Sequence, residues 1–261
     1  MSTKHEIKSQ DIKSIIETIT SNKHQVVIKN NQTKNYIFDL KTEKSNIEIK
    51  ISENSHVSFL ILSYQKQLID IKISASLGRF SSANFIFGFL NDQSNIETKV
   101  YLNGEAATAN INSLLVSKYN QTQKAYYEII NNYPYTNANI DVIGIANGNG
   151  EVRVDGIGQI NKGMHQSNNF QHLTGIISDD AVIEMNPYLL IDEHDVQAGH
   201  GATIGQIDEN IIYYMMSRGI SKDTASNLYI KGVITPFVDK IFARGLCEDF
   251  NKYLWSEQLW M

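Results

Sequence analysis

The chain has 261 residues, of which 42% are hydrophobic and 20% are charged, and its formal net charge is -5. This is the composition of a globular protein with a sizeable core, and it excludes a wholly disordered chain. The negative charge argues against a nucleic acid partner, because surfaces that bind phosphates are usually strongly basic.

The sequence also indicates where in the cell the protein is located. The N-terminus is polar and lacks the apolar stretch of a signal peptide, and no run approaches the roughly 20 apolar residues that span a membrane. We therefore expect a cytoplasmic protein without a membrane partner. The sequence contains one cysteine, Cys247. An intramolecular disulfide, or a multi-cysteine metal site made by this chain alone, is excluded.

The first predicted element is a short helical segment within residues 1–25. From Ser9 onward, isoleucines recur at helical spacing on one face, and a polar break follows at residues 20–23. These isoleucines are Ile12, Ile15, Ile16 and Ile19. We expect this helix to pack on the segment that follows it.

Residues 26–205 are predicted to form a β core. Segments such as NIEIKIS, LIDIKIS and NFIFGFL alternate between apolar and polar residues or are rich in β-branched and aromatic residues, which is typical of strands. They recur about every 8 to 14 residues, the spacing of a sandwich, a barrel or a solenoid.

The turn signals do not decide between these architectures. A sandwich or barrel usually shows distributed Asn-Gly and Asp-Gly hairpin turns, but here they are bunched. They are Asn103-Gly104, Asn147-Gly148, Asn149-Gly150 and Asp155-Gly156. The other short corners suit a parallel β-helix, in which stacked coils bury one continuous core, although no fixed repeat length is visible.

Residues 206–261 are predicted to form a C-terminal helical domain. Asp208 can cap a first helix, which Arg218 and Gly219 end with a cation and a C-cap glycine. Ser221 can open a second helix.

A third helix is predicted from Thr235 to Gly245, because Thr235-Pro236 reads as an N-cap followed by proline at the first helical position. A final segment runs from Leu246 to Trp260. The large aromatic residues of this tail indicate either a docking surface or a tail folded back on the β core.

Common catalytic and nucleotide-binding motifs are missing. The stretch from Gly158 to Gly163 has the glycine spacing of a P-loop, but Met164 and His165 stand where the lysine and hydroxyl residues must be. No nucleotide is therefore expected to bind. The glycines at 144, 148, 150, 156 and 158 are interpreted as turn glycines.

No nucleophile is supported either. The sequence has no G-x-S-x-G motif, and Cys247 lies in the predicted tail without a local base. We expect the chain not to be an enzyme.

Histidines and acidic pairs are the remaining candidates for chemistry. His165, His172 and His194 are interpreted as solvated strand or corner residues. His200 differs because small residues flank it on both sides and leave room for its imidazole to project. Two acidic pairs could do acid-base work or hold a cation, but loop solvation explains them better. These pairs are Asp179-Asp180 and Asp192-Glu193.

Three motifs follow one another at residues 187–191, 195–205 and 217–220. In this order they resemble the SufB/SufD family of iron-sulfur cluster assembly proteins. The family signature has a P-x-L-x-I segment, a D-V-x-x-x-H-G-A-T-x-G segment and a helix ending in S-R-G-I. This chain shows them at Pro187–Ile191, Asp195–Gly205 and Ser217–Ile220. The resemblance covers roughly residues 95 to 240.

The resemblance implies a right-handed parallel β-helix followed by a helical C-terminal domain. It also implies a complex, in which a SufB-like and a SufD-like subunit pair through their β-helix cores while their C-terminal helices each hold a SufC-like ATPase. Within the tail, the segment from Thr235 to Gly245 and its neighbours is our candidate for the ATPase dock.

The chain resembles SufD more closely than SufB. SufB-like proteins supply a cluster thiolate from the core, whereas Cys247 lies beyond the core here, and H-G-A-T is the SufD form of the motif. The resemblance makes His200 the candidate metal and cluster ligand, facing a partner's cysteine, with the iron-sulfur cluster bound transiently and shared. Ala198 stands where SufD often has cysteine, and only residues 1–25 precede the core, so a short, divergent SufD is indicated.

Two alternative functions stay open. One is a homodimeric cluster carrier in which two copies of His200 face each other. The other is a carbohydrate-active β-helix protein, which the acidic residues Asp179, Asp180 and Asp192 would serve.

Overall fold

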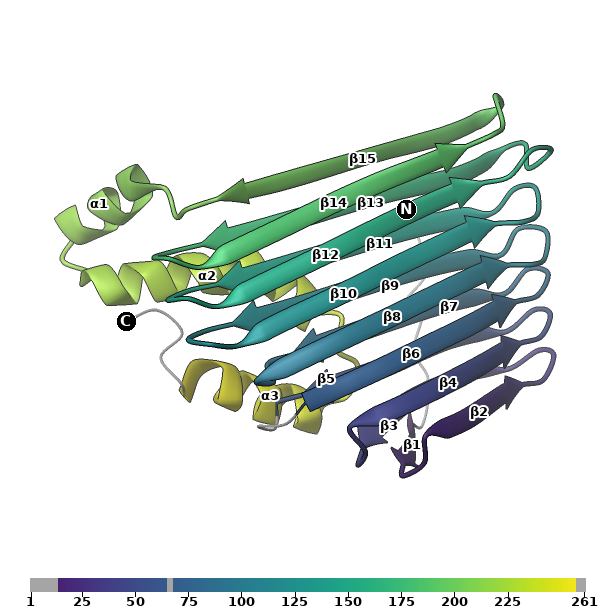
Figure 1. The fold of residues 1–261 in the computed structure, drawn as a ribbon, viewed down its shortest axis with the longest axis horizontal. Helices are drawn as coiled ribbons and strands as arrows, with labels where there is room; N and C mark the ends of the chain where they lie inside the picture. Colours follow the sequence, from purple (N-terminus) through teal and green to yellow (C-terminus); the bar gives the residue numbers. More distant parts are fainter. Residues whose placement is uncertain (1–13, 65–67, 257–261) are drawn as a thin grey trace, which may run out of the picture.

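The computed structural model describes residues 14–64 and 68–256. Strands come first and helices follow (Figure 1). The strands are β1 (Ser14–Ile19), β2 (Lys23–Ile28), β3 (Thr33–Leu40), β4 (Lys44–Ile51), β5 (His56–Ser63), β6 (Leu68–Leu77), β7 (Ser82–Phe89), β8 (Gln93–Leu102), β9 (Thr108–Ser117), β10 (Thr122–Asn131), β11 (Asn137–Ala146), β12 (Glu151–Ile160), β13 (Ser167–Ile177), β14 (Val182–Ile191) and β15 (Val196–Gly205). The helices are α1 (Glu209–Ser217), α2 (Lys222–Val238) and α3 (Arg244–Ser256).

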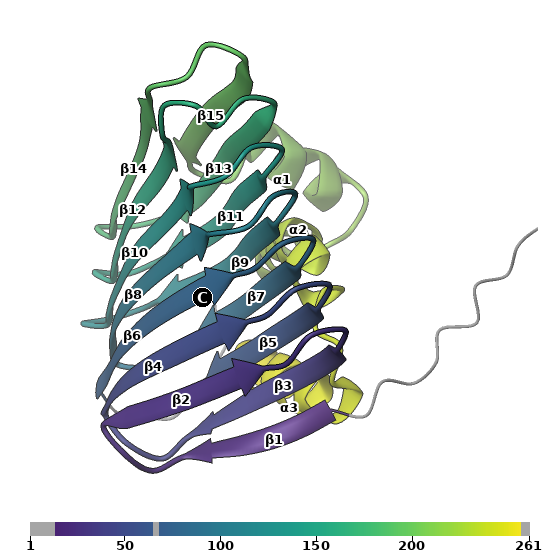
Figure 2. The same cartoon turned by 90° about the vertical axis from the view of Figure 1, so that its right-hand side faces the viewer.

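The strands form two parallel sheets that face each other. Odd-numbered strands make an 8-stranded sheet, here sheet A, and even-numbered strands make a 7-stranded sheet, here sheet B. The chain passes from one sheet to the other at every corner, so each pair of strands is one coil of a solenoid (Figure 2). The parallel β-solenoid predicted above is therefore confirmed, and the sandwich and barrel are excluded.

The coils differ in length, which explains why no fixed repeat is visible. Side chains that bond between adjacent coils are 25 residues apart at Lys72 and Glu97 but 31 apart at Asn137 and Asn168. The extra residues are absorbed in strands and corners, while the strands stay in register.

The lumen between the two sheets holds the main core. Alternate residues of each strand point inward and are buried, as the strict alternation in β4 shows. Aromatic rings from successive coils stack there, with centroids 5.5 Å apart for Tyr36 and Phe59 and 5.3 Å apart for Phe59 and Phe85. Near the middle, the Tyr127 hydroxyl lies 2.7 Å from that of Ser113, and burial raises the pKa of Tyr127.

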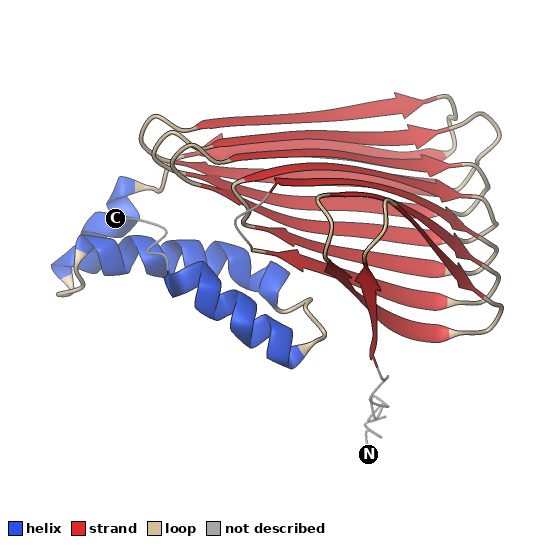
Figure 3. Ribbon diagram, turned by 60° about the horizontal axis from the view of Figure 1, so that its bottom comes forward, coloured by secondary structure: helices blue, strands red, loops and turns tan. Residues whose placement is uncertain are grey.

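A second core joins the helices to the outer face of sheet A (Figure 3). Ile230, Phe237 and Phe250 are buried against outward-facing apolar residues such as Leu60 and Leu114. The tail thus folds back on the β core. Within the described part of the chain, no helix covers the outer face of sheet B (Figure 2).

The predicted ends of the first tail helix are confirmed. The Asp208 carboxylate accepts from Asn210 N, 2.9 Å away, Arg218 is the C-cap, and Gly219 has a φ of +87°. The predicted cap of the second helix is also confirmed, because Ser221 Oγ accepts from Thr224 N at 3.3 Å.

The predicted N-terminal helix is wrong over the described residues. Ser14 to Ile19 form β1, and Ile15 and Ile19 pair in register with Tyr36 and Leu40 of β3. Ile12 lies outside the described residues. The isoleucine spacing fits a helix, but Ile15 and Ile19 are also in phase for a strand, and β-branched residues favour the strand once β3 offers a partner.

The predicted helix start at Thr235 is also wrong. Pro236 lies inside the last turn of α2, and the Thr235 hydroxyl donates to the carbonyl oxygen of Lys231 at 2.6 Å instead of capping a new helix. Phe237 and Ile241 are 3% and 7% exposed. Their burial on sheet A holds this segment in place despite the proline.

Three of the predicted turn glycines lie within strands. Gly148, with a φ of +63°, and Gly150 do occupy a corner, but Gly144 belongs to β11, and Gly156 and Gly158 belong to β12. Asp155-Gly156 is therefore not a turn. Gly156 and Gly158 face the lumen, where the side-chain amides of Gln171 and Asn169 lie against them.

Candidate functional site

The C-terminal end of the solenoid is open. β15 is the last strand of sheet A and β14 is the last strand of sheet B, and among the described residues each pairs with one strand only (Figure 1). Their outer edges therefore present backbone N–H and C=O groups without ladder partners. Such edges are templates for pairing with another chain.

The direction of the side chains at this end follows from the strand register. In β13, Gln171 is buried and its neighbour His172 is exposed, so Gln171 points into the lumen. β15 pairs with β13 with His200 opposite Gln171. Because paired residues of adjacent strands project to the same side, His200 points toward the lumen at its open end, where it is exposed.

A close contact between β13 and β15 confirms which side chains of β15 face the lumen. A methyl group on lumen-facing Gly175 would lie 3.2 Å from Cγ1 of Ile204, which is four residues along β15 from His200 and therefore on the same face of the strand. The side chains of this open end are here called the mouth. They are Ala198, His200, Ala202 and Ile204 of β15 and Pro187, Leu189 and Ile191 of β14.

Two buried amides form the floor of the mouth. Gln171 is 4% exposed and donates from Nε2 to the carbonyl oxygen of Tyr188 at 2.7 Å. Asn169 is fully buried and donates from Nδ2 to Asn131 Oδ1 at 2.9 Å. Gln171 Oε1 and Asn169 Oδ1 have no hydrogen-bond partner among the described residues. A buried, unpaired polar atom costs about 1–3 kcal/mol, so these two oxygens require an explanation.

Glycines in β12 make room for both amides. A methyl group on Gly156 would lie 2.7 Å from Gln171 Oε1, and one on Gly158 would collide with Asn169 Oδ1. Sequence reasoning missed Gln171 and Asn169. Their signal was the phase of the strand, because both residues alternate in step with buried Leu173.

Of the other histidines, His172 lines a cavity of about 380 Å³ together with His200, although the two side chains leave opposite faces of sheet A. His165 lies in the corner before β13, where its ring packs edge-on against Tyr135 with centroids 5.2 Å apart. His194 is exposed in the corner before β15, and His172 is exposed on the outer face of sheet A, opposite the side that His200 takes. The interpretation of these three as strand and corner residues is confirmed.

The acidic candidates are also separated. Asp179 and Asp180 precede β14 and Asp192 follows it, so this 10-residue strand keeps them about 30 Å apart. Glu193 has a structural role, because its carboxylate accepts from the backbone N–H groups of His194 and Gly163, each at 2.8 Å. These hydrogen bonds hold the pKa of Glu193 below its usual value, and the bond from His194 has the largest effect.

Neither a thiolate nor a complete metal site is found. Cys247 lies in α3, and burial raises its pKa, so it is a neutral thiol at pH 7. In the part of the chain that the structure describes, no three His, Cys, Asp or Glu residues are grouped so as to hold a metal ion. His200 therefore offers one nitrogen ligand, and any iron bound there needs further ligands from elsewhere.

The helices present a separate exposed apolar surface. On α1, Tyr213 is 75% exposed, Tyr214 59% and Met216 46%. A cavity of about 1180 Å³ lies between α1, the start of α2 and nearby corners, lined by Tyr213, Met216, Asp179 and Asp223 among others. By contrast, Phe237 and Ile241 of the predicted docking segment are buried on sheet A and are not available to a partner.

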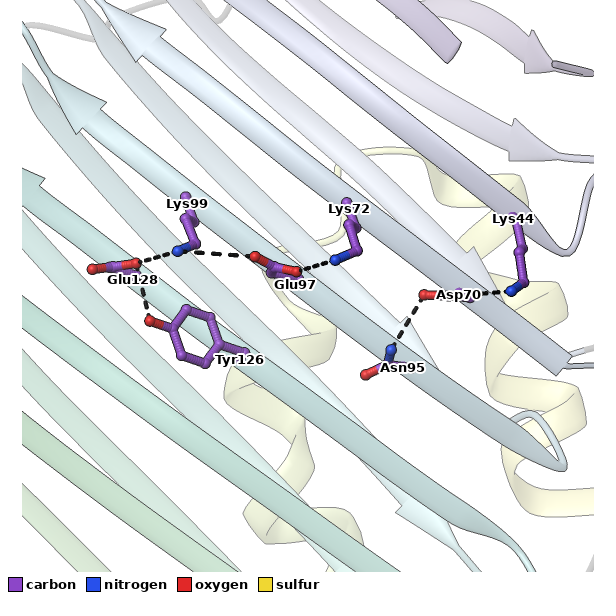
Figure 4. Close-up of polar contacts among 8 residues, drawn as sticks. All are labelled: Lys44, Asp70, Lys72, Asn95, Glu97, Lys99, Tyr126 and Glu128. Carbon is purple, nitrogen blue, oxygen red and sulfur yellow. Dashed lines mark hydrogen bonds and ion pairs between the residues drawn. The ribbon is translucent and has the colours of Figure 1, made fainter. Parts of the chain in front are cut away.

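The outer face of sheet B carries rows of paired charges (Figure 4). Lys72 bonds to Glu97 at 2.7 Å, and Lys99 bonds to Glu128 at 3.1 Å. The hydrogen bond to Glu128 is the main reason why the pKa of Lys99 is raised. Tyr126 also donates to Glu128, at 3.0 Å. Pairs of this kind, between register neighbours, stabilise the sheet.

Among the residues that the structure describes, no helix is long and apolar enough to cross a membrane.

Comparison with known proteins places these features in a family. Residues 9–233 match the model for the SufBD core domain of SUF system FeS cluster assembly. The chain is 33% identical over 146 residues to the iron-sulfur cluster assembly protein SufD of Bacillus subtilis, covering 56% of this chain and 33% of that protein. It is 26% identical over 207 residues to the protein of the same name of Escherichia coli, covering 76% of this chain and 48% of that protein.

A third relative is longer. An iron-sulfur cluster assembly SufBD family protein of Mycobacterium tuberculosis is 30% identical over 143 residues, which cover 54% of this chain and 17% of that protein. The chain thus spans less than half the length of each of these three relatives.

Proposed function

The chain belongs to the SufBD family of iron-sulfur cluster assembly proteins, and we propose that it is a SufD-like, non-enzymatic scaffold subunit that works in the cytoplasm. In this proposal it pairs with a SufB-like subunit through the open end of its solenoid. The cluster is cargo, held transiently between the two subunits.

The observation that carries this proposal is the position of His200. Its imidazole is exposed in the mouth, and the free edges of β14 and β15 flank it. Neutral imidazole binds iron, but clusters are usually held by thiolates from cysteine. Because the described residues offer no thiolate at this end, a cysteine of the partner completes the site. The cluster then forms only where the two subunits are correctly paired.

Pairing through the free edges follows from the general behaviour of β-sheets. An added strand satisfies the open N–H and C=O groups along β14 and β15 and continues the ladder across the interface. The apolar residues of the mouth, such as Leu189, Ala202 and Ile204, are then covered by the partner and lose contact with water.

In this proposal the ATPase dock lies on α1. Its exposed Tyr213, Tyr214 and Met216 form an apolar and aromatic surface beside the large cavity, which is the kind of surface that partner proteins cover. We therefore propose that a SufC-like ATPase contacts α1 and the start of α2, rather than the segment from Thr235 to Gly245.

Anaerobic co-expression with SufB-like and SufC-like proteins of the same organism tests the proposal. The wild type and His200→Ala are compared for recovery of the complex and for its iron and sulfide content. We expect equal recovery and a loss of most iron and sulfide from the variant. His172→Ala is the matched control, because His172 lies on the neighbouring strand but points to the outer face.

Three results would contradict the proposal. If no complex forms, the scaffold role is wrong; if both variants retain equal iron and sulfide, His200 is not a ligand. If the purified chain alone binds iron and sulfide through His200, the homodimeric carrier replaces the scaffold subunit.

A further inference from the structure

Gln171 stands beside His200 on the floor of the mouth. The two residues are register partners on adjacent parallel strands, and both project toward the lumen. Neighbouring strands are about 4.8 Å apart, so their side chains leave the sheet side by side. The Gln171 amide is 4% exposed, whereas the His200 ring is exposed at the opening above it.

The orientation of the Gln171 amide is fixed by its surroundings. Nε2 must donate to the carbonyl oxygen of Tyr188, 2.7 Å away, because a carbonyl oxygen accepts and cannot donate. This bond assigns the other end of the amide as Oε1. That oxygen is buried, has no partner among the described residues and lies in space that Gly156 keeps free.

A buried acceptor without a partner, next to an imidazole, matches a requirement of histidine ligands. A histidine that binds a metal through one ring nitrogen almost always donates the N–H of the other to a carbonyl, a carboxylate or water. That second bond selects the tautomer and holds the ring. Among the described residues, Gln171 Oε1 is the open buried acceptor in register with His200.

The His200 ring does not contact this oxygen in the structure, where Oε1 is unpaired. We propose that Gln171 is a positioning residue for His200: when the His200 side chain turns inward, Gln171 Oε1 accepts the hydrogen bond from one ring N–H, so that the lone pair of the other ring nitrogen points out of the mouth. The inference deepens the function proposed above, since it assigns a role to a second residue of the same site. The hydrogen bond itself needs neither iron nor a partner, so it can fail or hold independently of the scaffold role.

The test is the tautomer of His200 in the purified full-length chain. Two-dimensional 15N–1H spectra of histidine-labelled protein, recorded at pH 8, distinguish the two tautomers, and His200→Ala assigns the signals. Gln171→Met removes the acceptor with little change in volume. Gln171→Glu keeps an acceptor oxygen. Gln123→Met is the matched control, because Gln123 is also a fully buried lumen amide but bonds to the carbonyl oxygen of Asn91.

We expect one tautomer in the wild type, in Gln171→Glu and in Gln123→Met, and a mixture of both in Gln171→Met. A mixture in the wild type would overturn the proposal. So would a single, unchanged tautomer in a Gln171→Met variant whose circular dichroism is that of the folded wild type. If Gln171→Met does not fold, the folded Gln171→Glu variant decides: a mixture of tautomers in it would overturn the proposal, and a single, unchanged tautomer would support it.

In the assembled complex, loss of such a supporting bond typically lowers metal affinity about 10–100-fold. Iron titration of the complex carrying Gln171→Met is therefore expected to show a fall of this size, while the same titration with Gln123→Met is expected to match the wild type. Equal iron affinity of the two complexes would contradict a positioning role.

Discussion

At the scale of single residues, the floor of the mouth is built from residues that differ from the mainly apolar side chains of the rest of the lumen. Most inward positions are Ile, Val, Phe or Ala. Just inside His200 they are Gln171 and Asn169 on one side and Gly156 and Gly158 on the other. Glycine in a strand weakens it, so these positions are expected where another group must approach closely.

Gly158→Ala tests this close approach. We expect the added methyl group to collide with Asn169 Oδ1 and to destabilise the fold by about 1–3 kcal/mol, as overpacking of a core does. The measurement is the free energy of unfolding in urea. Gly201→Ala is the control, because its methyl group would meet no atom within 4 Å. Equal stability of the two variants would show that Asn169 does not occupy the lumen position described.

The residue scale also shows where sequence reasoning succeeds and fails. The small neighbours of His200 and the resemblance of its motif identified an exposed histidine, and the structure places it at the open end. Gln171 and Asn169 were missed because a polar residue in a strand is normally assigned to the solvent side. Only the register with β15 and the burial of both amides reveal that they face the lumen.

At the scale of elements, the rows of paired charges on the outer face of sheet B link successive coils (Figure 4). The pairs differ in burial. The Glu128 side chain is 11% exposed and is held by Lys99, whereas the Glu97 side chain, which is held by Lys72 and lies 3.9 Å from Lys99, is 33% exposed. A buried carboxylate depends on its partner far more than an exposed one does.

Lys99→Met should therefore destabilise the fold more than Lys72→Met does. We expect Lys99→Met to destabilise the fold by about 1–3 kcal/mol, because it leaves the buried carboxylate of Glu128 with the Tyr126 hydroxyl alone. Lys72→Met should change stability by less than about 1 kcal/mol. Thermal unfolding at pH 7 compares them. The double variant Lys99→Met/Glu128→Gln should regain much of the loss, and a failure to regain any would place the cost elsewhere.

The elements that were predicted wrongly share a cause. β1 and the end of α2 both carry apolar residues whose spacing fits more than one structure, and in each case a tertiary contact decides. β1 forms a strand because it pairs with β3. Phe237 and Ile241, at and beyond the end of α2, pack on sheet A and do not form a new helix. The helix caps at Asp208 and Ser221 were predicted correctly because a cap depends on local hydrogen bonds alone.

At the scale of the whole molecule, the fold is a solenoid with helices along the outer face of one sheet. Strand periodicity predicted the β core and its helical tail, but it could not distinguish a solenoid from a sandwich. That choice depends on which strands pair, and parallel pairing between coils of unequal length leaves no repeat in the sequence. The resemblance to the family signature is what predicted the solenoid.

The architecture also separates two surfaces that the proposed function needs. The mouth lies at the C-terminal end of the solenoid, and the exposed face of α1 follows directly after β15. A subunit partner and an ATPase can therefore bind the same chain at neighbouring but different surfaces. At the other end of the solenoid, β1 and β2 each pair with one strand only among residues 14–64 and 68–256, and this end serves as an internal comparison.

The most direct test of the account is whether pairing occurs at the C-terminal end of the solenoid. We would co-express the SufB-like protein with Ile204→Asp, which places a charge in the mouth, and with Val27→Asp, which places one on β2 at the opposite end; these side chains are 44% and 54% exposed. The mass of the purified assemblies is measured by light scattering, and thermal unfolding confirms that both variants fold. We expect Val27→Asp to form the paired assembly and Ile204→Asp to remain unpaired. Intact pairing by Ile204→Asp, or its loss only in Val27→Asp, would contradict the account.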